Sequence, residues 1–458
     1  MKNLPRLVFS ALALVAALVA GGCSAESKRQ GQLERAATHR RAGDFERARI
    51  EYQNVLQKFP DDITAIEGLA IIWRDRGATM REFALLAKLA PLAPGNLEAR
   101  IRRAQLFALL GSPADARREA LAAVSRSASA AEALVVLAET ARDVAERKET
   151  DDLLKNFPEK NNVWHSLAVS RFAWLRGDRE AARQAAARAV AIDPKSAAAR
   201  AAMGELQAQL GNAEQAAAEF KLVAELAPAR SRYRIQHANY LVQSGQLPAA
   251  VEALNAIVKE TPDNQAALRA LATAAMLDKR PADALAVLDK VFGLDAADYE
   301  ALILRARIWH AQGDAAKAVA EFQRIGTQFP GLGLELPNLA LAQLQQNDLP
   351  GATTTLEQAN ARFPDNHEIS ILLAQLHLRA GQHDRVVAAM TRLLGRRGDL
   401  VQPYLLLIDS AKATGKLDAL ADLFRQNIAS NPSVSLLHHM LGLTLRQQNK
   451  PAEARTSL

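Results

Sequence analysis

The chain has 458 residues, of which 49% are hydrophobic and only 5% aromatic, and its formal net charge is +7. A chain of this length could hold about three ordinary globular domains, but so few aromatic side chains suit closely packed, alanine-rich helices better than large aromatic cores. The positive charge is spread thinly, with no basic run longer than two arginines, so nucleic acid is not an expected partner.

Residues 1–22 have the features of a signal peptide and are not expected to be part of the fold. Lys2 and Arg6 precede an apolar run from Leu7 to Ala20. That run is too short for an ordinary membrane-spanning helix, which needs about 20 residues, and it has the length of a secretory apolar region. We expect residues 1–22 to be removed from the mature protein.

The small residues directly before Cys23 resemble the lipobox of bacterial lipoproteins, although Ala20 stands where that family usually has Leu. The resemblance implies cleavage before Cys23, lipidation of this residue with a diacylglycerol and a further acyl chain such as palmitate, and a short lipidated tether over residues 23–32. Ser24 follows in place of Asp, which resembles lipoproteins that are sorted to the outer membrane and face the periplasm. The alternative is an ordinary cleaved signal peptide in which Cys23, the only cysteine, is incidental.

The stretch from Ala197 to Arg230 predicts a pair of helices. The first is expected to end at the turn Gly211-Asn212, and the second to end at Pro228. Glycine adopts the left-handed conformation of a helix end at little cost, and proline cannot continue a helix. Gly204 and Ala216 are small where the two helices must cross closely. One such pair buries too little to fold alone and needs neighbours.

The same pattern recurs along the chain in steps of 34 residues or multiples of 34. The prolines that end the units are Pro194, Pro228, Pro262, Pro330, Pro364 and Pro432. The turn glycines are Gly177, Gly211, Gly245, Gly313, Gly381 and Gly415. The small residues seven positions before each turn are Ser170, Gly204, Ala238, Ala272, Ala306, Ala340, Ala374 and Gly442. The alanines five positions after each turn are Ala182, Ala216, Ala250, Ala284, Ala318, Ala352 and Ala454.

This combination of period and positions resembles the tetratricopeptide repeat, TPR. The positions of the central unit that match the family pattern are Gly204, Ala216, Phe220 and Pro228. The positions that depart from the usual Trp, Leu and Tyr are Arg200, Met203 and Gln207. The resemblance implies an all-α fold, a right-handed superhelical solenoid of about twelve helix-turn-helix repeats plus a truncated thirteenth, over residues 33–458.

Two repeats are expected to be irregular. The step from Gly111 to Gly177 is 66 residues where the frame requires 68, so the repeat over residues 129–160 is shortened. Pro337 predicts a first helix that begins near residue 336 or 337, since proline is tolerated in a first turn. The sequence stops within a second helix and lacks the polar cap that solenoids need, so we expect it to be a fragment of a longer protein.

We find no arrangement of residues that predicts catalysis, a metal site or a cofactor, and we expect the protein not to be an enzyme. In the TPR frame the first helices line a concave groove, so the resemblance implies that its binding residues lie there. The candidate groove residues are Trp164, Arg171, Trp174, Asn239, Arg269, Arg307, His310 and Arg379. Their mixture of charged and aromatic side chains suits an extended peptide or an anionic polysaccharide.

Long TPR lipoproteins similar to this chain accompany exopolysaccharide secretion, including systems that sort PEP-CTERM proteins, and others serve envelope assembly. The resemblance therefore implies a lipid-anchored scaffold in the bacterial cell envelope, with envelope proteins or extended peptides as partners and the membrane bound through Cys23. The alternative is direct binding of an anionic polysaccharide or a peptide ligand in the groove.

Overall fold

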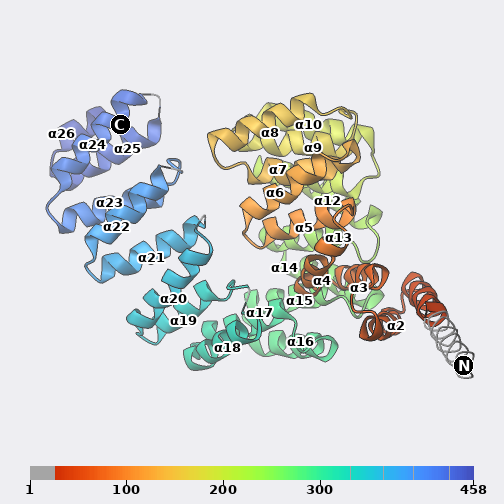
Figure 1. Cartoon of the computed structure of the whole chain (residues 1–458). Coiled ribbons are helices and arrows are strands. Elements are labelled where there is room, and N and C mark those ends of the chain that lie inside the picture. Colours follow the sequence, from red (N-terminus) through yellow and green to blue (C-terminus); the bar gives the residue numbers. More distant parts are fainter. Residues whose placement is uncertain (1–25, 331, 365, 396, 433, 458) are drawn as a thin grey trace, which may run out of the picture. The chain divides into compact units, whose positions relative to one another are not determined.

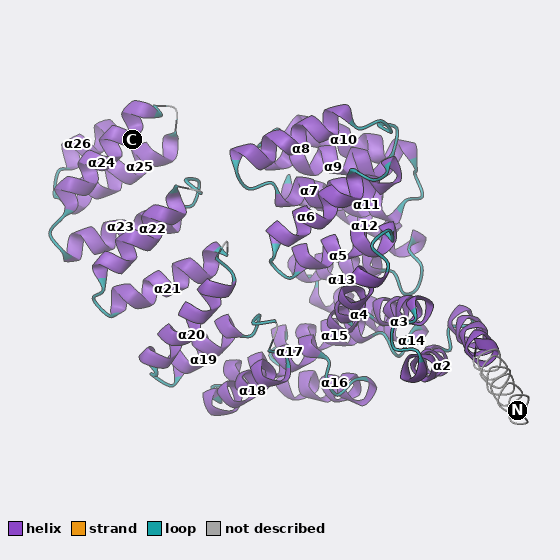
Figure 2. Ribbon diagram, viewed as in Figure 1, coloured by secondary structure: helices purple, strands orange, loops and turns teal. Residues whose placement is uncertain are grey.

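The structure is a computed structural model that describes residues 26–330, 332–364, 366–395, 397–432 and 434–457 (Figure 1). Helices are the only regular elements in these residues, which agrees with the all-α expectation (Figure 2). None of the helices in these ranges combines the length and the apolar character that crossing a membrane requires. Cys23 and the proposed signal peptide lie outside the described residues.

The helices form two compact units, one ending at Ala301 and one beginning at Leu302. The first unit holds a helix over residues 26–41, then α2 (Phe45–Lys58), α3 (Ile63–Arg76), α4 (Thr79–Leu92), α5 (Leu97–Leu109), α6 (Pro113–Val124), η1 (Ala128–Ala130), α7 (Ala131–Thr140), α8 (Val144–Asn156), α9 (Val163–Leu175), α10 (Arg179–Ile192), α11 (Ala197–Gln209), α12 (Ala213–Leu226), α13 (Arg232–Gln243), α14 (Leu247–Glu260), α15 (Gln265–Leu277), α16 (Pro281–Leu294) and the start of α17 (Tyr299–Ala311).

The second unit continues α17 and alternates in the same way. Its other helices are α18 (Ala315–Gln328), α19 (Leu336–Gln345), α20 (Leu349–Arg362), α21 (His367–Arg379), α22 (His383–Leu394), α23 (Val401–Ala413), α24 (Leu417–Ser430), α25 (Ser435–Gln447) and α26 (Pro451–Ser457).

The central repeat folds as its sequence predicts, with α11 before the turn and α12 after it. The Ser196 hydroxyl accepts a hydrogen bond from the Ala199 amide at 3.2 Å and caps α11. Gly211 ends the helix with a φ of 83°. Gly204 lies against the Phe220 ring so closely that a Cβ on residue 204 would be 3.0 Å from the ring, and Ala216 is fully buried. The small residues are therefore required by the close crossing of the two helices.

The turn position of the frame has a positive φ even where it is not glycine. All the glycines predicted at this position have a φ between 69° and 84°. The frame places Lys279, Asn347 and Asn449 at the same position, and their φ values are 59°, 61° and 58°. Asparagine tolerates this region better than most residues, and lysine less well. The repeat geometry therefore fixes the backbone of the turn, whichever residue occupies it.

The irregular positions have local explanations. In the repeat at 129–160, α7 has only ten residues and the connection to α8 is Ala141–Asp143. Helix α19 begins at Leu336 with Pro337 in its first turn, as the sequence predicts. Glu82 occupies a position that is alanine in other repeats, and its buried carboxylate accepts two hydrogen bonds from Arg102, at 2.7 and 2.8 Å. The ion pair replaces the missing small residue.

Candidate functional site

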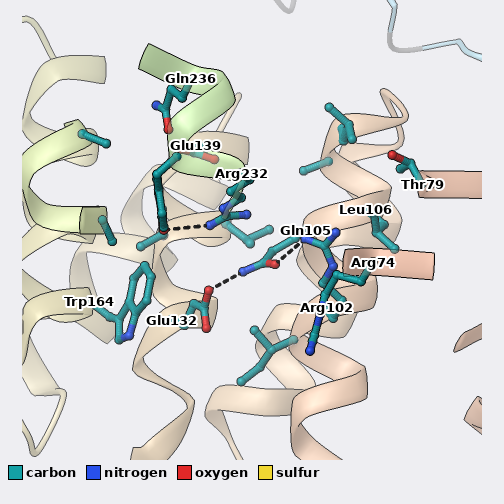
Figure 3. Close-up of a pocket in the computed structure, with 18 of the residues that line it drawn as sticks. Arg74, Thr79, Arg102, Gln105, Leu106, Glu132, Glu139, Trp164, Arg232 and Gln236 are labelled. Atoms are coloured by element: carbon teal, nitrogen blue, oxygen red, sulfur yellow. Dashed lines mark hydrogen bonds between the residues drawn. The ribbon is translucent and has the colours of Figure 1, made fainter. Parts of the chain in front are cut away.

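The first unit contains a cavity of about 1270 Å³ (Figure 3). Its wall comes mainly from the first helix of successive repeats: α3, α5, α7, α9, α11 and α13, with the start of α15. The volume is larger than the roughly 300–1,000 Å³ typical of a small-molecule site. The cavity therefore suits a segment of a polymer better than a small ligand.

The wall closes on itself because the end of α3 contacts the start of α15, almost 190 residues later. A Cβ on Gly77 would lie 2.5 Å from the Cβ of Ala266. The Arg269 Nη2 group donates a hydrogen bond to the Gly77 carbonyl oxygen at 2.7 Å. The first and last helices of the wall thus meet at this point, which closes the ring of helices around the cavity.

Ion pairs reinforce this closure. Arg76, which is buried, donates from Nε to the Asp263 carboxylate at 3.1 Å, and Arg230 donates to the other oxygen of the same carboxylate at 2.6 Å. Arg81 holds Asp295 through two hydrogen bonds, at 2.9 and 2.7 Å. We name the following set the clasp: Arg76, Gly77, Arg81, Arg230, Asp263, Ala266, Arg269, Asp295 and Asp298.

The wall of the cavity carries both signs of charge. Its charged side chains are Arg74, Asp75, Glu98, Arg102, Glu132, Glu139, Arg142, Arg171, Arg230 and Arg232. Gln105 links two of them: it accepts a hydrogen bond from Arg102 at 3.2 Å and donates one to Glu132 at 2.7 Å (Figure 3). Arg171 pairs with Glu205 and lies 3.4 Å from Glu139. Most of the charge in the wall is thus already compensated.

Two carboxylates of the wall are held in surroundings that disfavour their charge. Burial within the cavity raises the pKa of Glu139, against the opposing effect of Arg171, although 44% of the side chain is accessible. Burial likewise raises the pKa of Asp75, against the effect of Arg74. A cationic or hydrogen-bond-donating group of a ligand would therefore be stabilised at either position.

Arg232 lies on the cavity side of α13, where Glu132 and Glu139 act on its charge. Its guanidinium lies over the Tyr233 ring, 5.0 Å from the centroid, and donates to the Tyr233 hydroxyl at 3.1 Å. The exposed Arg232 is therefore oriented by its neighbour and can donate to a ligand.

Between α9 and α13 the wall is apolar and recessed. Helix α11 contributes only Ala198, Ala201 and Ala202 to the lining, while Trp164 and Tyr233 flank these alanines on the adjacent helices. Small side chains between two aromatic ones leave room for a large apolar side chain of a ligand. The cavity thus combines an apolar recess with charged and hydrogen-bonding groups.

Family models described as tetratricopeptide repeat match residues 29–72, 235–299, 275–332 and 343–406. The chain carries tetratricopeptide repeats. This finding, together with the helix pairs described above, confirms the TPR solenoid predicted from the period. Comparison with curated protein sequences finds no match.

Several solved structures are similar to this chain. The match with the crystal structure of yeast Tom70 covers 94% of this chain and 96% of the Tom70 chain, at 14% sequence identity and a TM-score of 0.48. The match with the crystal structure of the APC/C hetero-tetramer Cut9–Hcn1 covers 92% of this chain and 90% of the matched chain, at 15% sequence identity and a TM-score of 0.37. The match with the human IFIT1 dimer with m7Gppp-AAAA covers 79% of this chain and 88% of the matched chain, at 14% sequence identity and a TM-score of 0.37.

The residues predicted to line the TPR groove fall into three groups. Trp164 and Arg171 lie in the wall of the cavity. Arg269 belongs to the clasp, Trp174 packs half-buried beside Met203 and Leu206, and Asn239 is exposed outside the wall. The remaining three are in the second unit: exposed Arg307 and half-buried His310 on α17, and exposed Arg379 on α21.

Arg232, Tyr233 and the residues of the clasp were not predicted from the sequence, apart from Arg269. The first two could have been found, because they lie at the start of a first helix in the TPR frame. The clasp has no signal in the frame, since it joins residues from different repeats.

The clasp should make the stability of the first unit depend on pH. Burial raises the pKa of Asp298 to about 6, with Arg269 opposing the rise. The folded state therefore binds a proton that the unfolded state, with a carboxyl pKa near 3.9, has lost between about pH 4 and pH 6. Stability must fall as the pH rises through that window. From this group we expect about 1 kcal/mol less stability at pH 7 than at pH 5.

Denaturant titrations of the wild type and of Asp298→Asn at both pH values measure this contribution. The amide can still accept the hydrogen bond that Asp298 takes from the Ala301 amide at 2.8 Å, but it does not titrate. The pH-dependence of the wild type should therefore exceed that of the variant by the stated amount. An identical pH-dependence in both proteins would contradict the assignment.

Proposed function

We propose that the protein is a lipid-anchored scaffold of the bacterial cell envelope that holds a segment of a protein partner in the cavity of its first unit. TPR proteins typically bind protein partners or peptides, and their repeats typically serve as non-enzymatic scaffolds. The single observation that carries the proposal is the wall itself, which offers an apolar recess, charges of both signs and hydrogen-bonding groups around a space of polymer size.

The charge of the wall decides between the two ligand classes. Six arginines line the cavity, which would favour an anionic polysaccharide, but four carboxylates line it as well. A polymer with a negative charge on every repeat would face Glu98, Glu132 and Glu139 together. Most of the arginines are already paired with carboxylates, so little uncompensated positive charge is left to hold such a polymer. A peptide can place opposite charges and apolar side chains separately, so a peptide fits better.

The envelope location rests on the lipobox-like residues before Cys23. We place the scaffold at the outer membrane, facing the periplasm, in exopolysaccharide secretion or envelope assembly. The resemblance to TPR lipoproteins of those systems supports this assignment.

Site-specific photo-crosslinking in living cells tests the binding role. A photoreactive amino acid at position 164, in the cavity, should give adducts with a discrete set of envelope proteins. The matched control is the same amino acid at position 188, because Arg188 is exposed on α10 outside the cavity wall. Equal adduct patterns at both positions would contradict binding in the cavity.

Cys23→Ser should abolish the lipid anchor. One acyl chain binds membranes only marginally, whereas several give stable attachment. We expect the variant to remain in the aqueous phase of a detergent partition, and the wild type to enter the detergent phase. A variant that stays with the membrane after a high-salt wash would show that the attachment does not depend on Cys23.

A further inference from the structure

We propose that the clasp is a gate: it opens to admit a partner segment sideways into the cavity and closes around that segment. The proposal rests on the proposed function for the identity of the occupant. Its physical basis is independent of the partner, because the closure is built from residues of the first unit alone.

The contact at the clasp is specific to Gly77 among the turn glycines. A Cβ added to most turn glycines would have no other atom within 4 Å, and these are Gly43, Gly111, Gly177, Gly211, Gly245, Gly313, Gly381 and Gly415. Gly77 is different, because the side chain and backbone of Ala266 lie within 3.3 Å of the position that its Cβ would occupy. The Arg269 guanidinium also bonds the Gly77 carbonyl oxygen. The end of α3 is thus fitted to a distant repeat, which an exposed turn does not need.

The clasp is held together by other interactions than the rest of the first unit. Neighbouring repeats are joined by buried apolar side chains, such as Phe220, which is 1% exposed. The clasp is held by charges: Arg76 with Asp263 and Arg81 with Asp295. In repeat proteins the stability comes from each repeat and its interfaces with its neighbours. Opening the clasp therefore leaves every repeat folded and breaks mainly ionic contacts.

The closed wall limits what can enter the cavity. A wall that is closed around its circumference admits a free chain end along its axis, but an internal segment of a partner can enter only between two parts of the wall. Elsewhere in the wall, such an opening would break the apolar interface between two neighbouring repeats. At the clasp the two parts of the wall are not neighbouring repeats and share no such interface. The occupant we infer is thus a single unfolded segment within a longer partner chain, with a large apolar side chain for the recess beside Ala202.

The chain supplies a reporter of the clasp. Trp73 on α3 lies beneath both clasp arginines, with the Arg76 guanidinium 5.7 Å and the Arg81 guanidinium 5.8 Å from its ring centroid. Opening the clasp separates both arginines from the carboxylates of Asp263 and Asp295 that hold them, which changes the charges around the ring. Trp73 fluorescence, measured in a chain whose other tryptophans are phenylalanine, should therefore change when the clasp opens.

Access to the cavity can be measured without any partner. A single cysteine replaces Ala202 in the full chain carrying Cys23→Ser, and its reaction rate is measured with a small maleimide and with a maleimide attached to a small folded protein. R81D should raise the rate with the large reagent at least tenfold and leave the rate with the small reagent unchanged. The charge exchange R81D/D295R should return the rate towards that of the parent.

Two controls accompany these variants. A cysteine at Ala208, which is exposed on the same helix, should react equally in all of them, and R188D tests the effect of a charge reversal away from the clasp. Circular dichroism verifies that each variant is helical, and R76D/R81D breaks both ion pairs if R81D alone leaves the rate with the large reagent unchanged. Trp73 fluorescence is measured in D295R, which breaks the pair with Arg81 and keeps both arginines beside the ring. If the large reagent reacts equally fast with the parent and with the open variants, the gate is wrong. If crosslinks still form from position 164 in that case, the proposed function is supported although the gate is wrong. If labelling depends on the clasp but position 164 gives no crosslinks, the gate is supported and binding of a protein partner in the cavity is not.

Discussion

Phe220→Ala is expected to lower the free energy of unfolding of the first unit by about 3–5 kcal/mol. The ring is fully buried, and it stacks on Tyr240 with centroids 4.4 Å apart and on His237 at 6.3 Å. It also fills the space left by Gly204, which has no side chain to move into a cavity. The site can therefore relax little when the ring is removed, and the cost belongs at the upper end for an aromatic residue.

Hydrogen exchange measures this effect better than a single unfolding midpoint, because a repeat array need not unfold in one step. Amides of α11, α12 and α13 should lose protection, while those of α3 lose less, since the interactions are between neighbours. Phe220→Leu should cost less than half as much. Gly204→Ala should destabilise the wild type, where its Cβ meets the ring at 3.0 Å, and be tolerated better in the Phe220→Leu background. Unchanged exchange in Phe220→Ala would show that the ring does not hold the helix crossing.

The repeat architecture could be predicted from the sequence because it is a local property. Small residues recur at the positions of Gly204 and Ala216 in most repeats, and apolar residues recur at the position of Phe220. Each has its partner within the same repeat or the next. The same frame identifies Lys279 as a turn residue with positive φ, although its residue type gives no such indication. A periodic pattern therefore carries more information than the individual residues in it.

The clasp and the division into two units could not be predicted in this way. The contact between Gly77 and Ala266 depends on small rotations that accumulate over several repeats, and no pattern within one repeat encodes their sum. The TPR frame assigns Trp164 and Arg171 to the groove, and the structure places both in the wall of the cavity. Arg269 was assigned by the same rule, but its guanidinium is drawn into the closure by the Gly77 carbonyl and Asp298. The TPR frame predicts the direction in which a side chain points. Its contacts with residues of distant repeats depend on the geometry of the superhelix.

Arg269→Ala is expected to cost about 3–5 kcal/mol near neutral pH, because it removes one partner of a buried ion pair. The Arg269 side chain is 12% exposed and that of Asp298 is 0% exposed. The substitution also removes the donor to the Gly77 carbonyl oxygen. The clasp should therefore loosen, and the amides of residues 76–82 and 263–269 should exchange faster than those of α9, which lies across the cavity.

The pH-dependence of this cost distinguishes an uncompensated charge from lost packing. Arg269 lowers the pKa of Asp298, against the burial that raises it, so its removal should raise that pKa above 6. A carboxyl group with a raised pKa is most destabilising when it must ionise. The cost of Arg269→Ala should thus be larger at pH 8 than at pH 5. In an Asp298→Asn background, where no charge is left unpaired, the same substitution should cost only about 1 kcal/mol, the value of an ordinary hydrogen bond. An equal cost in both backgrounds would mean that Arg269 stabilises the first unit through its packing alone, and that its ion pair with Asp298 contributes nothing to the clasp.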